Sequence, residues 1–270
     1  MKLVLASLAV GALGTLAGCP GPGGKGTRPY AEPKVEDILA KLAKQRETRT
    51  SFTASSKMDY WLGSQRVKGD VLVMGTSGKK VRFNALSPAG GDVLADMACD
   101  GAAFAYVDKQ NNCQLTGPCD RSSIAAFLRI ELEPDDFLDL AVGTPPVLDG
   151  ATGTTTWDGT KGYERVKLAS AAGTQTITID ARDGHYDVVD SEMKDPAGKT
   201  VWSVENGDFT DVPDATSGTH RLPSKTRFKS PQESADLVVE WGERTINPTI
   251  DPTKFTVAIP AGLPRCGSKP

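Results

Sequence analysis

The feature that most limits the fold of this chain is an alternation of apolar and polar residues, which recurs over most of its length. In the first such segment, Phe52, Ala54, Met58 and Tyr60 alternate with polar side chains. A period of two is typical of a β-strand that buries one face. The chain is therefore expected to form its core mainly between the faces of β-strands.

The connections between such segments predict how the strands pair. More segments with the same period lie between residues 65 and 118 and between residues 152 and 259. Short turn sequences such as Ser77-Gly78 and Asp183-Gly184 separate them, and short turns join antiparallel neighbours. We therefore expect a mainly β fold, a strongly curved antiparallel sheet or half-open β-barrel of about 11 strands.

Three segments have helical rather than strand periodicity. Residues 33–47 place Ile38, Leu42 and other apolar residues three or four positions apart, which predicts an amphipathic helix. Residues 122–130 and 134–142 predict two short helices inserted in the middle of the sheet. We expect the helices to cover one face of the sheet.

The second inserted helix carries three acidic residues, Asp135, Asp136 and Asp139. One interpretation is a carboxylate cluster for metal binding or acid–base chemistry. The interpretation we prefer is that the two acids in the first turn interact favourably with the helix dipole and that the other acidic residue faces water.

Composition limits the domain organisation and the class of partner. Residues 33–270 are expected to form a single domain, which is well within the size range of one large β domain. The net charge of the whole chain is −3, with no basic stripe, so nucleic-acid binding has no electrostatic support. Beyond the N-terminus, no stretch is long and apolar enough to cross a membrane.

The N-terminus has the pattern of an export signal. Lys2 precedes an apolar run that is too short for a mature membrane-spanning helix and that ends in Leu16-Ala17-Gly18-Cys19. This ending resembles the lipobox of bacterial lipoproteins. The resemblance implies that residues 1–18 are a signal peptide and that Cys19 becomes a lipidated N-terminus with acyl chains such as palmitate. The alternative is an ordinary secretory signal in which the cysteine occurs by chance.

The residues after Cys19 are rich in proline and glycine, and residues 19–32 are expected to form a flexible tether. Gly21 to Thr27 faintly resembles a phosphate-binding loop, but it lacks the preceding buried strand that such a loop needs. Pro20 follows the cysteine, where enteric lipoproteins retained in the inner membrane have Asp. This favours an outer-membrane location facing the periplasm.

Four further cysteines indicate disulfide bonds rather than a metal site, because the chain is expected to be exported and neither histidine is near them in sequence. Four cysteines allow three pairings. If Cys99 ends one strand of a meander and Cys119 ends the next strand but one, these two meet. That leaves Cys113 for Cys266.

The order of elements and the local sequence resemble the lipoprotein-localisation family, namely the periplasmic carrier LolA and the outer-membrane receptor LolB. Arg82 to Gly90 resembles the third strand and following loop of the receptor. Pro134 to Gly143 resembles its second internal helix, and Phe255 to Gly262 resembles the closing strand of the carrier.

The resemblance implies a half-open barrel covered by helices, with an apolar cavity for the acyl chains of lipids or lipoproteins and without a cofactor or metal. The residues expected to line that cavity are Met58, Tyr60, Val71, Val73, Phe83, Trp202, Val239 and Trp241. The alternative is that the same residues form a closed core.

The chain departs from the family pattern at three places. The receptor has a membrane-inserting Leu in the loop after its third strand, where this chain has Ala89 as the expected membrane-facing residue. The carrier has an Arg before the third strand that contacts the covering helices, and the nearest equivalents here are Lys79 and Lys80. The four additional cysteines are absent from both patterns.

The sequence thus favours a membrane-anchored, periplasm-facing lipoprotein that binds acyl chains and takes part in lipoprotein sorting. The alternative is a non-enzymatic envelope scaffold with the same fold and a filled core. We do not expect an enzyme, because His185 and His220 have no catalytic partner at motif spacing and are both interpreted as surface loop residues.

Overall fold

The computed structural model describes residues 26–88, 91–128 and 132–267. Within them, 13 strands form one antiparallel sheet in the order β6-β5-β4-β3-β2-β1-β13-β12-β11-β10-β9-β8-β7. The strands are β1 (Ser51–Leu62), β2 (Gln65–Thr76), β3 (Lys80–Leu86), β4 (Val93–Asp100), β5 (Ala103–Asp108), β6 (Cys113–Pro118), β7 (Thr152–Asp158), β8 (Tyr163–Ser170), β9 (Gly173–Asp180), β10 (Asp187–Lys194), β11 (Thr200–Pro213), β12 (Thr219–Ser230) and β13 (Ala235–Ile246).

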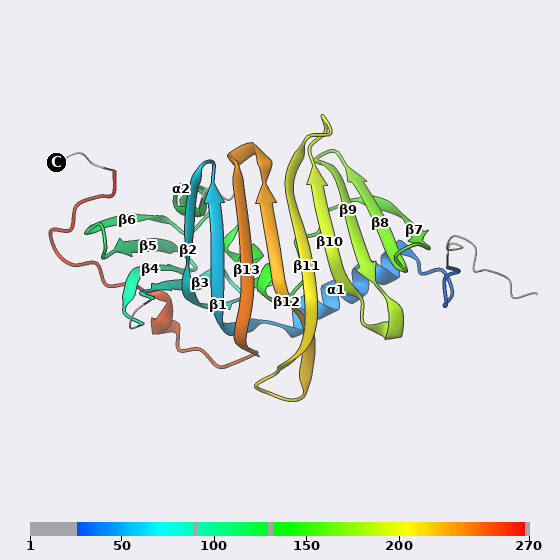
Figure 1. Ribbon diagram of the computed structural model, residues 1–270, viewed down its shortest axis with the longest axis horizontal. Coiled ribbons are helices and arrows are strands. Elements are labelled where there is room, and N and C mark those ends of the chain that lie inside the picture. The colour runs from blue at the N-terminus through cyan, green and yellow to red at the C-terminus, as the bar shows by residue number, and fades with distance from the viewer. Residues whose placement is uncertain (1–25, 89–90, 129–131, 268–270) are drawn as a thin grey trace, which may run out of the picture.

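The sheet consists of two meanders joined by one pairing between strands that are distant in sequence. Strands β1 to β6 and strands β7 to β13 each pair with their sequence neighbours, and β1 pairs with β13 in the middle. The sheet is strongly curved and does not close, with β6 and β7 at its two edges (Figure 1). The mainly β, curved antiparallel fold is confirmed, but it has 13 strands rather than about 11.

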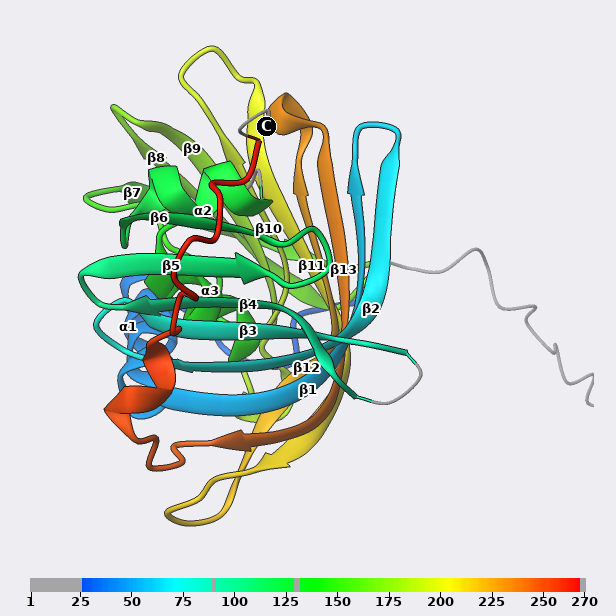
Figure 2. The ribbon, with the colours of Figure 1, turned by 90° about the vertical axis from the view of Figure 1, so that its left-hand side faces the viewer.

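Three α-helices lie on the concave side of the sheet, as Figure 2 shows for α2 and α3. They are α1 (Val35–Thr48), α2 (Arg121–Leu128) and α3 (Pro134–Ala141), which confirms the three predicted helices. Helix α1 begins with Glu36 and Asp37 in its first turn, where acidic side chains interact favourably with the helix dipole. None of the helices in the described residues has the length and apolar character needed to cross a bilayer.

The concave face holds two separate apolar cores. Helix α1 buries Ile38 and Leu42 against β8, β9 and β10. Helices α2 and α3 cover β1 to β5 and β11 to β13. Polar side chains lie at the boundary, where the buried Asn206 donates to the carbonyl of Val188 and accepts from Thr226. Trp241 in turn donates to the Thr226 hydroxyl at 3.1 Å. The row formed by Asn206, Thr226 and Trp241 separates the core under α1 (the α1 core) from the core under α2 and α3 (the α3 core).

The two disulfides are Cys99–Cys119 and Cys113–Cys266, which is the pairing expected from the sequence. The first joins β4 to the short link between β6 and α2, and the second joins the edge strand β6 to the C-terminal segment. Of the described residues, no three His, Cys, Asp or Glu side chains form a group suited to a metal ion.

The predicted closing strand at residues 254–259 is wrong. A 3₁₀ helix, η3 (Pro252–Phe255), takes its place, and the chain continues without regular structure. The alternation of Phe255 and Val257 resembles a strand, but β1 and β13 already have a partner on each side. No central position in the sheet is therefore open to this segment, and it crosses the outside of β3 and β4 instead.

The described part of the predicted tether packs on the sheet. Gly26 exchanges two hydrogen bonds with β7 and its turn, donating to the Gly159 carbonyl and accepting from the Trp157 indole, each at 2.8 Å. Arg28 forms an ion pair with Glu164 on β8. The folded part of the chain therefore begins before residue 33. The predicted signal peptide at 1–18, the predicted lipid-attachment residue Cys19, most of the segment that faintly resembles a phosphate-binding loop, and Ala89 lie outside the described residues.

Candidate functional site

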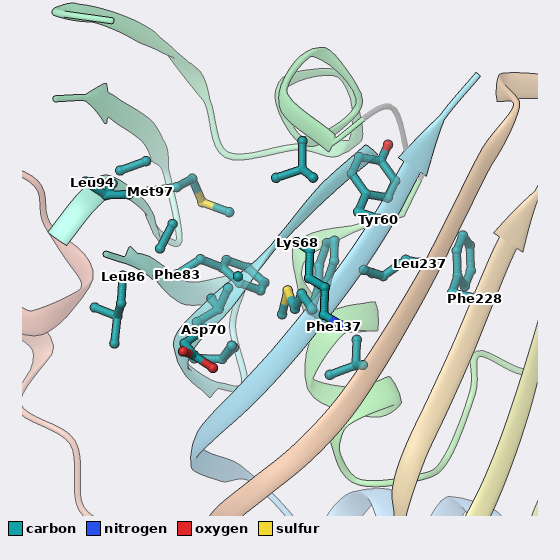
Figure 3. A pocket seen from close by; sticks show the side chains of 18 of the residues that line it. Tyr60, Lys68, Asp70, Phe83, Leu86, Leu94, Met97, Phe137, Phe228 and Leu237 are labelled. Carbon is teal, nitrogen blue, oxygen red and sulfur yellow. The ribbon is translucent and has the colours of Figure 1, made fainter. Parts of the chain in front are cut away.

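An apolar cavity of about 590 Å³ lies between the curved sheet and helix α3. Its walls come from one half of the sheet, β5 to β1 together with the adjoining strands β13 and β12, and its cover comes from α3 and the residue Leu132 before it (Figure 3). The size is in the ordinary range for a small-molecule site. Because the cavity is not filled by side chains, the closed core of the alternative hypothesis is not observed.

Seven of the eight residues expected to line a cavity do so, namely Met58, Tyr60, Val71, Val73, Phe83, Val239 and Trp241. Trp202 does not. It lies on β11, one strand beyond the cavity wall, and stacks on Phe228 with a ring-centroid distance of 6.4 Å. Phe228 rather than Trp202 faces the cavity, because β12 and not β11 forms this part of the wall.

Several lining residues were missed by the sequence analysis. On α3, Phe137 and Leu140 reach the cavity, and the Phe137 ring meets the Phe83 ring edge-on at 5.4 Å. Leu94 and Met97 on β4 also contribute. The spacing of Phe137, Leu138 and Ala141 in the sequence places Phe137 on the apolar side of the helix, but only the packing shows that this side covers the sheet.

Polar side chains lie at the rim of the cavity, where Lys68, Asp70 and Gln110 contribute to the lining. Deeper, the Tyr106 hydroxyl donates to Asp108 at 3.1 Å. Burial, together with the negative charge of Asp108, raises the pKa of Tyr106 well above its ordinary value, so its hydroxyl stays protonated. An amphiphile in this cavity would therefore bury its apolar part and leave its polar part at the rim.

Helix α3 is held at its N-terminal end by residues of the β2–β3 turn. The Lys79 backbone N–H donates to Asp135 at 2.7 Å, and its ammonium lies 3.5 Å from Glu133. Glu133 and Asp136 complete a capping box. Of the two lysines considered in the sequence analysis, Lys79 therefore contacts a covering helix, whereas Lys80 lies in β3.

At its other end, α3 is held by two buried arginines. Arg49 donates to the Val142 carbonyl and Arg244 to the Ala141 carbonyl, each at 2.8 Å. Burial lowers the pKa of both guanidinium groups to about 10, and for Arg244 the nearby charge of Arg49 adds to the effect. Cations at a helix C-terminus satisfy carbonyls that have no partner within the helix.

Of the three acids of α3, two have the predicted role and one does not. Asp135 and Asp136 lie in the first turn and accept backbone hydrogen bonds. Asp139 does not face water freely: it is largely buried, 3.8 Å from Arg46 of α1. Burial raises the pKa of Asp139 to about 7, although Arg46 opposes the change.

The two histidines lie apart from the cavity. His185 is exposed after the short 3₁₀ helix η1 (Arg182–Gly184), as expected. The interpretation of His220 as a surface loop residue is wrong, because it lies in β12 with Nε2 at 2.7 Å from Asp214. Its Nδ1 accepts from Arg49 at 3.4 Å. Asp214 lies in the turn between β11 and β12, only six residues before His220, whereas the contact with Arg49 joins residues that are far apart in sequence.

A curved, unclosed antiparallel sheet with helices and an apolar cavity on its concave side defines the LolA-like fold, and this chain has that fold. It is similar to a LolA superfamily protein from Nitrosomonas europaea, with a TM-score of 0.54 and 10% identity over 84% of this chain and 99% of that one. It is also similar to a putative outer membrane lipoprotein-sorting protein domain from Vibrio parahaemolyticus, with a TM-score of 0.54 and 10% identity over 81% and 94% of the two chains. No family description and no curated protein matches the sequence.

Proposed function

We propose that this protein is a lipid-anchored, periplasm-facing protein of the bacterial cell envelope that binds the acyl chains of lipids or lipoproteins, as a step in lipoprotein sorting to the outer membrane. The observation that carries the proposal is the cavity of about 590 Å³ with mainly apolar walls. Burial of apolar surface stabilises a bound chain by about 0.8 kcal/mol per methylene. Binding of this kind needs no catalytic residue, metal or cofactor.

Two further observations support the proposal. The fold is shared with a protein described as an outer membrane lipoprotein-sorting domain. The Leu16-Ala17-Gly18-Cys19 sequence fits lipid attachment at Cys19, and the acyl chains on such a residue suffice for stable anchoring. We therefore propose that the protein binds the membrane through the lipid on its N-terminal cysteine.

The first experiment tests binding. The chain from Pro20 to Pro270 is exported behind an ordinary cleavable signal, and native mass spectrometry shows whether acyl lipid or acylated peptide co-purifies. We expect bound mass that extracts as acyl lipid. A bare polypeptide that also takes up no added acylated peptide would remove the proposal and favour the scaffold.

A matched pair of glycines makes this experiment specific to the cavity. Gly69 lies on the cavity wall in β2, and a Cβ built there meets no atom within 4 Å, so Gly69→Trp places a ring in the cavity without a backbone clash. Gly207 in β11 has equal space but lies outside the cavity lining. We expect Gly69→Trp to lose bound lipid and Gly207→Trp to keep it. If both variants kept the same amount of bound lipid, the lipid would not lie in this cavity.

The anchor is tested on the full-length protein. We expect the mature N-terminus to be Cys19 carrying acyl chains, and Cys19→Ser to abolish membrane attachment in cell fractions. Recovery of all the wild-type protein in the inner membrane would exclude a receptor role at the outer membrane.

A further inference from the structure

The volume of the cavity limits how many acyl chains it holds. A water molecule occupies about 30 Å³ of liquid, and a methylene group is of similar size, so 590 Å³ accommodates about 20 methylene-sized groups. That is one chain of about 16 to 20 carbons. Two chains of that length need roughly twice the space.

Neighbouring side chains close the cavity on the sides toward which a second acyl chain would extend. Toward the centre of the sheet, Trp241 and Thr226 form the cavity wall, and their hydrogen bond continues to Asn206. Beyond this row, the concave face is already filled by Ile38 and Leu42 of α1, both almost completely buried. The α1 core thus occupies the space that a longer cavity would need.

The cover of the cavity is also fixed. Helix α3 is held at both ends, by Lys79 at the start and by Arg49 and Arg244 at the end. The disulfide Cys99–Cys119 ties the start of α2 to β4. Widening the cavity would break several of these contacts together, so the volume seen in the structure is the volume offered to a ligand.

The entrance favours an apolar chain with a polar end. Val67 lines the cavity and is nevertheless 67% exposed, which marks the open end, and Lys68 and Asp70 lie next to it in β2. A chain inserted from this end leaves its head group in water beside side chains of both charges.

Resting on the function proposed above, we propose that the cavity takes a single acyl chain of about 16 to 20 carbons, so that its ligand is a one-chain amphiphile or one chain of a larger lipid. Any additional chains of that lipid stay outside the protein. The shared chemistry is one long apolar chain with a polar end.

A series of lysophosphatidylcholines with acyl chains of increasing length tests the longest acyl chain that the cavity holds. The protein used is the polypeptide from Pro20 to Pro270. We expect the Kd to fall roughly fourfold for each added methylene while the cavity fills. The fall should stop at about 16 to 20 carbons. A Kd that continues to fall well beyond this length would overturn the single-chain limit but leave acyl binding intact. Absence of binding at every length would overturn the proposed function as well.

The number of chains is tested with a three-chain probe. A synthetic triacylated lipopeptide is expected to bind one per protein, with a Kd within about tenfold of the lysolipid of equal chain length, since only one chain is buried. A Kd lower by about 100-fold or more would mean that further chains are buried, which contradicts the inference. Two lysolipids per protein in native mass spectra would contradict it equally.

Variants at Gly69 and Gly207 test whether the length of the cavity, rather than binding elsewhere on the protein, sets the longest chain that fits. Gly69→Leu adds four carbons to the cavity and is expected to move the end of the series to shorter chains by about four carbons. Gly207→Leu is expected to leave the series unchanged. An unchanged series in Gly69→Leu would show that the chain does not lie along β2.

Discussion

Glu164 on β8 is a fully buried acid, with 0% of its side chain exposed. Arg28 contacts both of its oxygens, with Nε at 2.8 Å from Oε1 and Nη2 at 3.1 Å from Oε2. The Arg28 guanidinium also lies over the Trp157 ring at 5.8 Å. A buried ion pair gives little net stability against an apolar replacement, but removal of one partner leaves a charge without compensation.

At this site we expect Arg28→Met to lower the free energy of unfolding by about 3–5 kcal/mol. The double variant Arg28→Met with Glu164→Leu should lose clearly less, because no buried charge is left. Arg66→Met is the control: Arg66 contacts Asp59 in the same two-bond manner but is half exposed, so the expected loss is much smaller than for Arg28→Met. Urea unfolding measures all three. Equal losses for Arg28→Met and Arg66→Met would show that the 26–32 segment does not contribute to the fold.

At the scale of elements, helix α3 contains an acid whose protonation is linked to folding. Burial raises the pKa of Asp139 from its ordinary 3.8 to about 7. Between about pH 4 and pH 7 the native state therefore holds a proton that the unfolded chain has already released. Stability falls as the pH rises through this window, and the full cost, at most about 4 kcal/mol, is present above pH 7.

We expect Asp139→Asn to be more stable than the wild type at pH 8 and to lose this advantage at about pH 3, where Asp139 is protonated in the native state and largely protonated in the unfolded chain. Thermal unfolding at the two pH values measures the difference. Asp135→Asn is the control with the opposite sign at pH 8, because an acid in the first turn stabilises the helix by about 0.3–1 kcal/mol. A pH-independent effect of Asp139→Asn would mean that Arg46 keeps the carboxylate ionised.

The same helix shows what sequence alone reveals about the site. Its bounds followed from the period of its apolar residues, and the cavity-facing strand residues followed from the alternation through Met58 and Val71 together with the resemblance to a known family. The buried environment of Asp139 did not, because Arg46 and the sheet reach it from elsewhere in the chain. Local patterns give the face of an element, whereas burial of a polar group depends on what packs against that face.

At the scale of the whole molecule, the C-terminal segment differs most from its prediction, because its alternating residues do not form a strand. It leaves β13, buries Phe255 beside β3 and β4, and reaches the edge strand β6 (Figure 2). There the Gln114 N–H donates to the Pro264 carbonyl and its carbonyl accepts from Cys266, each at 2.9 Å. Alternation in a segment predicts a strand only if an edge is available, and the disulfide pairing was the stronger signal of where this segment ends.

This arrangement covers part of an edge that would otherwise be open to pairing with another chain, which is a known liability of sheets. Cys113–Cys266 fixes the cover to β6, and its two cysteines are 153 residues apart in sequence. Removing a native disulfide typically costs about 2–5 kcal/mol, with a larger cost for a longer loop. The bond therefore has two separable effects, one on stability and one on exposure of the β6 edge.

We expect the double variant Cys113→Ser with Cys266→Ser to unfold at lower urea concentration than the wild type and to self-associate more strongly, because the cover of β6 is no longer fixed. Analytical ultracentrifugation over a concentration series measures the association. Cys99→Ser with Cys119→Ser is the matched control, since that bond does not involve the C-terminal segment that covers β6, and its loss should lower stability without a comparable change in association. If the first variant loses stability but associates no more than the second, then the backbone contacts of Gln114 and the burial of Phe255 are enough to keep the edge covered.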